Sequence, residues 1–186
     1  MWISSYLSKM KNLSILLFLL FYNCSKEVSY MKKALEYESL GKNNEAIYYY
    51  SLSLKENKDY FPANKSLGIL LSQKVESHDV ASHYLELAYK EKKEEEILFR
   101  LLDLYLLHSQ TDKYKLIKNE IPLEKKEFIE DVFSCLKNTE DSPNIAKKIS
   151  TVFSLKVNEF FYLSVAHCFA QNGFENKQFE LLDKFK

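Results

Sequence analysis

Glycine and proline are scarce, with three of each in 186 residues. A β-sandwich or barrel with many tight turns needs more of both, and the long segments rich in Leu, Lys, Glu and Tyr favour helices instead. Hydrophobic residues make up 46% of the chain, enough to bury a core, so global disorder is not expected. The sequence therefore predicts an all-α protein made of one domain or one short repeat array.

An excess of charge of one sign is also absent. The chain has 26 basic and 26 acidic residues and a formal net charge of zero. Because proteins that bind nucleic acid normally carry a basic patch or stripe, nucleic acid is not an expected partner.

The chain lacks a hydrophobic run long enough to span a bilayer. Its most apolar stretch, residues 13–22, is about half of the roughly 20 residues that a span needs. Lys9 and Lys11 precede it, and a short basic region before a short apolar region is the pattern of an export signal. Met10 is a second possible start, because the signal is complete from there. An uncleaved signal anchor, ordinary secretion and a buried helix remain alternatives.

The apolar stretch ends in Phe21-Tyr22-Asn23-Cys24, which resembles a relaxed form of the lipobox of bacterial lipoproteins. That box has an aliphatic residue three positions before the cysteine and small residues just before it. The resemblance implies that residues 1–23 are a lipoprotein signal peptide and that the Cys24 thiol carries a diacylglyceryl group. Acyl chains such as palmitate would then anchor the mature chain to a membrane of the bacterial cell envelope.

Residues near this cysteine bear on the location of the mature chain, 24–186. Ser25 stands where many inner-membrane lipoproteins have Asp, so the outer membrane is expected. Two lysines leave with the signal, so the mature chain has 24 basic residues beside 26 acidic ones. Electrostatic attraction of the whole chain to an anionic membrane is therefore not the expected anchor.

Residues 30–57 are predicted to form two helices. On the first, residues at spacings of three and four share one face: Tyr30, Ala34, Tyr37 and Leu40. Gly41 supplies a left-handed C-cap, and Asn43 or Asn44 caps the second helix. On the second helix the same period runs through Ala46, Ile47, Tyr50, Ser53 and Leu54.

This segment resembles a tetratricopeptide repeat (TPR), in which small residues let two helices approach while aromatic residues fill the remaining volume. The places that match are Tyr30, Ala34, Tyr37, Gly41, Ala46, Tyr50 and Ser53. The resemblance implies an α-solenoid of stacked antiparallel helix pairs, a TPR-like superhelix over residues 24–186. Its units are expected at about 27–61, 62–94, 95–122, 124–156 and 159–186. In the second repeat unit, Gly68 stands 34 residues after Ala34, at the place of the small residue that lets the two helices approach. An irregular helical bundle is the alternative.

A concave face is the functional consequence of such a fold. In this family that face commonly binds a peptide or helix of another protein. The matching places predict a groove lined by Met31, Leu35, Glu38, Lys65, Ile69, Ser72, Phe99, Asp103, Leu106, Leu163, His167 and Ala170. The resemblance thus implies an adaptor or assembly factor in the cell envelope, or a surface lipoprotein that contacts host or environmental molecules. A face that packs on itself or is solvated is the alternative.

The end of the chain is unusually apolar for a terminal repeat. Phe179, Leu182 and Phe185 lie on one face of the last predicted helix, and nothing follows to cover them. We expect this helix to dock on a partner or on a second copy of the chain.

Motifs of catalysis and metal binding are missing. The sequence has no HExxH, Cys-x-x-Cys, G-x-S-x-G or phosphate-binding glycine loop, so no enzyme activity, metal or cofactor is predicted. Two histidines, His78 and His83, flank a predicted turn, and His108 and His167 stand alone. All four are interpreted as solvated or groove residues.

Two cysteines remain after Cys24, and both are expected to be buried. Cys135 and Cys168 belong to adjacent predicted units, so a disulfide is possible in an exported protein. The favoured interpretation is that they are unpaired, small apolar residues of the core.

Overall fold

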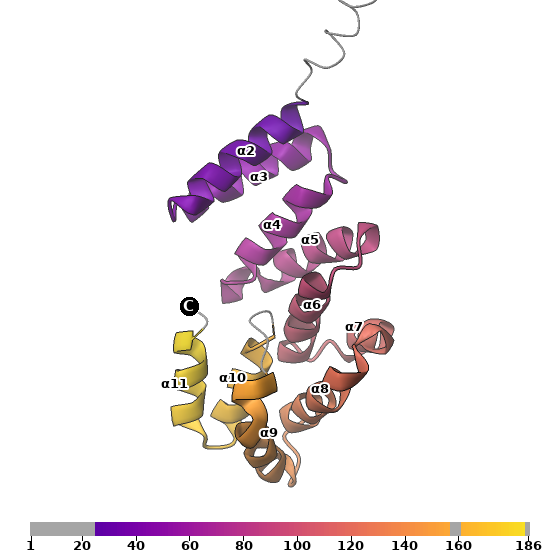
Figure 1. Cartoon of the computed structure of the whole chain (residues 1–186), viewed down its shortest axis with the longest axis vertical. Helices are drawn as coiled ribbons and strands as arrows, with labels where there is room; N and C mark the ends of the chain where they lie inside the picture. The colour runs from indigo at the N-terminus through magenta and orange to yellow at the C-terminus, as the bar shows by residue number, and fades with distance from the viewer. Residues whose placement is uncertain (1–24, 157–160, 185–186) are drawn as a thin grey trace, which may run out of the picture. The chain divides into compact units, whose positions relative to one another are not determined.

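The computed structural model describes residues 25–156 and 161–184, and the regular secondary structure in these ranges is helical (Figure 1). They contain ten α-helices, two short 3-10 helices and no β-strand, which confirms the all-α prediction. The predicted signal peptide, Cys24 and Phe185 lie outside the described residues. Within the described part, no helix is both long and apolar enough to cross a bilayer.

The helices follow one another as α2 (Lys26–Ser39), α3 (Asn43–Glu56), α4 (Phe61–Leu71), α5 (His78–Glu91), α6 (Glu95–Leu107), α7 (Thr111–Ile117), α8 (Leu123–Leu136), α9 (Ser142–Lys156), α10 (Leu163–Gln171) and α11 (Glu175–Lys184). The 3-10 helices are η1 (Val75–Ser77) and η2 (Lys118–Glu120). Each range predicted as a repeat unit covers two α-helices, with α2, α4 and α8 each starting one residue early. The chain divides into two compact units, Met1–Ala63 and Asn64–Lys186.

In the first unit, α2 and α3 pack side by side along their length (Figure 1). Six side chains of this pair are buried, three of them small and three large: Met31, Ala34, Ala46, Tyr50, Ser53 and Leu54. The hydroxyl of Ser53 donates to the backbone carbonyl of Glu27 at 2.7 Å, which joins the end of α3 to the start of α2. The alternation of small and large residues thus sets a close helix pair.

The turn between α2 and α3 confirms one predicted cap and overturns the other. Gly41 has φ +69°, the left-handed conformation expected of it. The amides of Gly41 and Lys42 donate to the carbonyls of Glu38 and Tyr37, as in a Schellman motif. Because this turn is so short, α3 begins at Asn43 itself and Lys42 holds the N-cap position, so the predicted asparagine cap is wrong.

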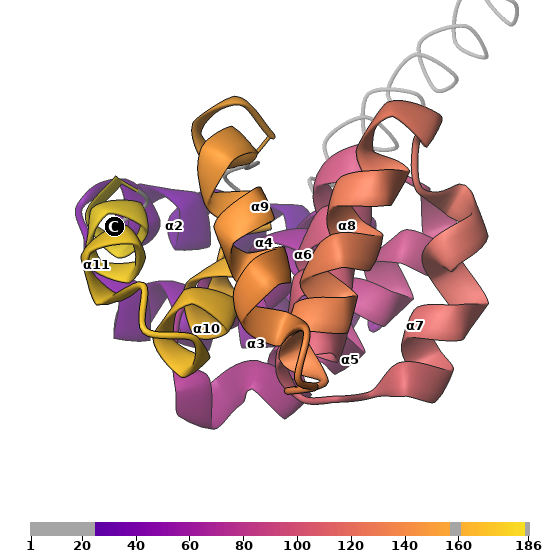
Figure 2. The ribbon, with the colours of Figure 1, turned by 90° about the horizontal axis from the view of Figure 1, so that it is seen from below.

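The second unit is built around α6. Ten of its thirteen residues are buried, which is typical of a helix covered on all sides. It contacts α5, α7, α8 and α10, while α8 pairs with α9 and α10 with α11 (Figure 2). The predicted close approach of α4 and α5 is also present, because a Cβ added to Gly68 would lie 2.7 Å from Leu85 Cγ.

The direct contact of α6 with α10 departs from a simple stack of repeats. These helices belong to the third and fifth predicted units, and in a regular solenoid each repeat contacts only its neighbours. What the structure establishes is an array of helices packed in neighbouring pairs, in which the last pair returns to the third.

The last helix is anchored by a residue other than those predicted to form its apolar face. Leu181 is fully buried, whereas Phe179 is 61% exposed and Leu182 is half-buried. Thus α11 uses Leu181 for its own packing.

Candidate functional site

The central part of the predicted groove is closed. Phe99, Asp103 and Leu106 of α6 are at most 3% exposed, so the prediction that they line an open face is wrong. The cause is the packing of α10 and the residues before it onto α6, where the rings of Phe99 and Phe161 lie 6.5 Å apart. The alternative that this face packs on itself therefore applies to α6.

Asp103 has a structural role at this contact. Its carboxylate accepts hydrogen bonds from the backbone amides of Tyr162, Leu163 and Ser164 at 3.0, 2.8 and 2.7 Å. The Ser164 hydroxyl donates to the Asp103 carbonyl at 2.8 Å. A helix leaves its first amides without partners inside the helix, so this side chain of α6 caps α10 from about 60 residues away in the chain.

The charge of Asp103 is subject to opposing effects. Burial raises the pKa of its carboxyl above the usual value, because the interior disfavours the charged form. Hydrogen bonds from Ser164 and Leu163, and the charge of Arg100, act in the opposite direction without reversing the shift.

The other predicted groove residues are in varied environments. Met31 and Ser72 are buried, so they too do not line an open groove. Glu38 accepts a hydrogen bond from the Tyr50 hydroxyl. Leu35 is 47% exposed, His167 is exposed and bonded to Gln171, and three more are half-buried: Ile69, Leu163 and Ala170.

Lys65 is held by two carboxylates. Its ammonium lies 2.7 Å from Glu94 and also pairs with Glu96 at the start of α6. Burial lowers the pKa of Lys65, but the hydrogen bonds to these glutamates outweigh it, so the pKa lies above its usual value. The lysine joins α4 to α6.

Two histidines form a pair that sequence reasoning missed. Nδ1 of His78 lies 2.8 Å from Nε2 of His108, and Nε2 of His78 lies 3.1 Å from the carbonyl oxygen of Ser72. Because a carbonyl only accepts, the neutral ring of His78 carries its proton on Nε2, and its Nδ1 accepts from His108. His78 is 2% exposed, so the predictions that it is solvated and that His108 stands alone are wrong.

The pair does not extend into a metal site. Among the described residues, no group of three or more His, Cys, Asp or Glu side chains is arranged to hold a metal ion.

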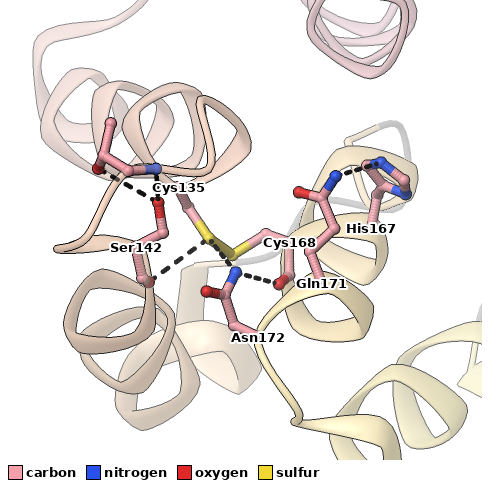
Figure 3. Close-up of a disulfide and its surroundings, with 7 residues drawn as sticks. Cys135, Ser142, His167, Cys168, Gln171 and Asn172 are labelled. Carbon is pink, nitrogen blue, oxygen red and sulfur yellow. Dashed lines mark hydrogen bonds between the residues drawn. A yellow bond between two sulfur atoms is a disulfide. The ribbon is translucent and has the colours of Figure 1, made fainter.

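Cys135 of α8 and Cys168 of α10 form a disulfide (Figure 3). Their sulfurs are 2.07 Å apart and their Cα atoms 5.8 Å, and neither residue is exposed to solvent. The burial was predicted correctly, but the interpretation as unpaired cysteines is wrong. The reason is the contact of α8 with α10, which brings together two buried positions from different predicted repeat units.

Polar groups surround the disulfide. Asn172 donates its side-chain amide to Cys135 Sγ at 3.3 Å and to the Cys168 carbonyl at 2.8 Å (Figure 3). The Ser142 hydroxyl accepts a hydrogen bond from the backbone amide of Thr139, with the two atoms 2.8 Å apart, and this bond orders the turn before α9. These contacts order the ends of the helices that carry or flank the disulfide.

Comparison with protein-family models, with curated proteins and with solved structures gave no match for this chain.

Proposed function

We propose that this chain is a lipoprotein of the bacterial cell envelope, anchored through Cys24, that acts as a protein–protein adaptor or assembly factor. The observation that carries the proposal is the disulfide between Cys135 and Cys168. Disulfides persist in oxidising compartments outside the cytosol, as export would require. This disulfide uses two of the three cysteines, and the third is the one that ends the lipobox-like segment.

We propose further that the five helix pairs are divergent TPR-like units of an α-solenoid, whose last pair folds back onto the third. The Schellman turn at Gly41 and the helix approach at Gly68 support this reading. Since α6 is covered by α10, the binding surface for a partner lies on other helices of the array.

The anchor is tested by a single substitution. In cells fed a labelled fatty acid, Cys24→Ser is expected to abolish labelling and release the chain from membranes. The matched control is the double variant Cys135→Ser/Cys168→Ser, which removes two cysteines but keeps the lipid site and should stay labelled. If Cys24→Ser remains labelled and membrane-bound, the lipoprotein assignment is wrong.

The orientation of the chain is tested separately. Protease added to intact cells should leave the protein whole if it faces the periplasm. A protein that contacts host or environmental molecules would be cleaved by the same treatment. Crosslinking in membranes followed by capture of the protein would then identify the adaptor's partner.

A further inference from the structure

Four tyrosines and two lysines gather on one face of the α2–α3 pair. We call it the tyrosine–lysine face, formed by Tyr30, Lys33, Tyr37, Lys42, Tyr48 and Tyr49. Tyr37 and Tyr49 stack with their centroids 5.3 Å apart and their planes within 6°. Tyr30 and Tyr48 flank the ring of Tyr49 at 6.4 and 5.3 Å.

Each lysine lies over one ring of the stacked pair Tyr37 and Tyr49. Lys33 Nζ is 5.4 Å from the centroid of Tyr49, and Lys42 Nζ is 5.9 Å from that of Tyr37. These cation–π contacts leave the ammonium charges uncompensated by an anion. Within the described residues, no carboxylate lies within 4 Å of either ammonium, including the neighbouring Glu36 and Glu45.

The face is open to solvent. Both lysines are exposed, Tyr48 is 59% exposed, and the other three tyrosines are half-buried. Several lysines of the second unit, by contrast, are neutralised by carboxylates: Lys65, Lys93, Lys113, Lys125 and Lys148. The tyrosine–lysine face thus joins aromatic rings, phenolic hydroxyls and free positive charge, a combination suited to an anionic layer with an apolar side.

Chain connectivity limits how far Lys33 of this face can be from the proposed anchor. Helix α2 begins at Lys26, two residues after Cys24, a distance of at most about 7 Å along an extended chain. The rise of a helix adds about 10 Å from Lys26 to Lys33. If Cys24 carries the lipid, Lys33 therefore lies within about 18 Å of the anchored residue whatever the orientation of the helix.

We propose that the tyrosine–lysine face rests on the anionic phospholipid headgroups of the leaflet that holds the Cys24 acyl chains. This inference rests on the proposed lipid anchor. Lys33 and Lys42 would meet lipid phosphates, while the tyrosines would lie at the boundary of headgroups and acyl chains, where their amphipathic rings are favoured. The slight negative charge of the mature chain as a whole does not oppose this local contact, because charge interactions decay within a Debye length.

The test uses the mature, lipidated protein purified from membranes. It is reconstituted into vesicles of phosphatidylglycerol and phosphatidylethanolamine, and separately into neutral phosphatidylcholine vesicles. A water-soluble amine-acetylating reagent is added, and the acetylation rate of each lysine is followed by peptide mass spectrometry. Lys137 is the matched control, since it is exposed and lies over the ring of Phe133 at 4.3 Å.

We expect Lys33 and Lys42 to be acetylated about fivefold more slowly on the anionic vesicles than on the neutral ones. This factor corresponds to an attraction of about 1 kcal/mol between each lysine and an anionic surface. Lys137 should react equally on both vesicles. The proposal is overturned if Lys33 and Lys42 are each acetylated as fast on anionic as on neutral vesicles. It is also overturned if Lys137 is protected as strongly as they are, or if inorganic phosphate alone protects them. Protection that appears only with an added envelope protein would also overturn it.

The same samples separate this inference from the anchor on which it depends. The mass of the N-terminal peptide shows whether Cys24 carries a diacylglyceryl group. A lipidated peptide with unprotected lysines rejects only the membrane-facing role of the tyrosine–lysine face. An unmodified peptide rejects the anchor and the inference together.

Discussion

At the residue scale, Asp103 shows how one buried side chain can position a helix that lies far along the sequence. Its carboxylate binds three successive amides at the start of α10, and its own carbonyl accepts from Ser164. Nothing in the local pattern distinguishes this aspartate from a surface residue of α6, because its partners lie about 60 residues away.

Removing this cap should destabilise the second unit. Asp103→Ala leaves the amides of Tyr162, Leu163 and Ser164 without their acceptor, and we expect the free energy of unfolding to fall by about 2–4 kcal/mol. Asp103→Asn keeps one acceptor oxygen and should lose less. Urea unfolding followed by circular dichroism measures both. The control Asp112→Ala, at an exposed residue, should change stability by less than about 0.5 kcal/mol. An equally small effect of Asp103→Ala would contradict the capping role.

The histidine pair predicts a loss of stability in acid. Burial, and then the charge of His108, lower the pKa of His78, while the Ser72 hydrogen bond and the charges of Asp103 and Asp79 raise it by less. A lowered pKa means that folding favours the neutral form. The stabilisation of the fold by neutral His78 is therefore complete above the pKa of histidine in the unfolded chain, about 6.5. It is lost as the pH falls through the pKa of His78 in the folded protein.

Thermal melts over a pH series measure this effect. The melting temperature of the wild type should decline below about pH 6.5 more steeply than that of His78→Gln, which cannot titrate. His167→Gln is the matched control, because His167 is exposed and should leave the wild-type profile unchanged. Parallel profiles of the wild type and His78→Gln would refute the role of His78.

At the scale of elements, the turns and contacts of the helix pairs depend on glycine in two different ways. Gly41 is needed for its left-handed backbone and has open space around it. Gly68 has no unusual backbone angle but lies against Leu85. Sequence reasoning assigned both roles correctly, because each follows from the local order of small residues, apolar residues and turns.

Alanine at these glycines should act through different mechanisms. In Gly68→Ala the new Cβ would lie 2.7 Å from Leu85 Cγ and 3.1 Å from the Leu85 amide nitrogen. We expect a loss of about 1–3 kcal/mol, although alanine favours a helix more than glycine does. Gly41→Ala should cost about 1 kcal/mol through its positive φ.

A double-mutant cycle separates the two mechanisms. The penalty of Gly68→Ala should shrink in a Leu85→Ala background, whereas that of Gly41→Ala should not, as measured by urea unfolding. A stabilising Gly68→Ala would show that α4 and α5 are not in close contact.

At the scale of the whole molecule, the disulfide and the α6–α10 contact make the second unit more than a linear series of pairs. The disulfide joins residues 33 positions apart and closes a loop that contains α9. In the chain-entropy model, a loop of this length corresponds to about 4 kcal/mol of constraint on the unfolded chain.

Reduction should therefore weaken the second unit selectively. We expect reductant, or Cys135→Ser/Cys168→Ser, to speed hydrogen exchange in α8, α9 and α10 and to leave α2 and α3 unchanged. Hydrogen exchange with mass spectrometry resolves the two units, and the first unit is the internal control. Alkylation of either cysteine in the native, unreduced protein would show that they are not paired.

The sequence by itself determined the features that depend on neighbours in the chain: the helical class, the Gly41 turn, the close contact at Gly68 and the burial of both cysteines. It did so because helical periodicity and turn chemistry act over a few residues. The tertiary structure alone decided which buried residues meet. The pairing of Cys135 with Cys168, the His78–His108 contact and the capping of α10 by Asp103 depend on how helices distant in sequence pack together. Periodicity shows which face of a helix is buried, but not which other helix covers it.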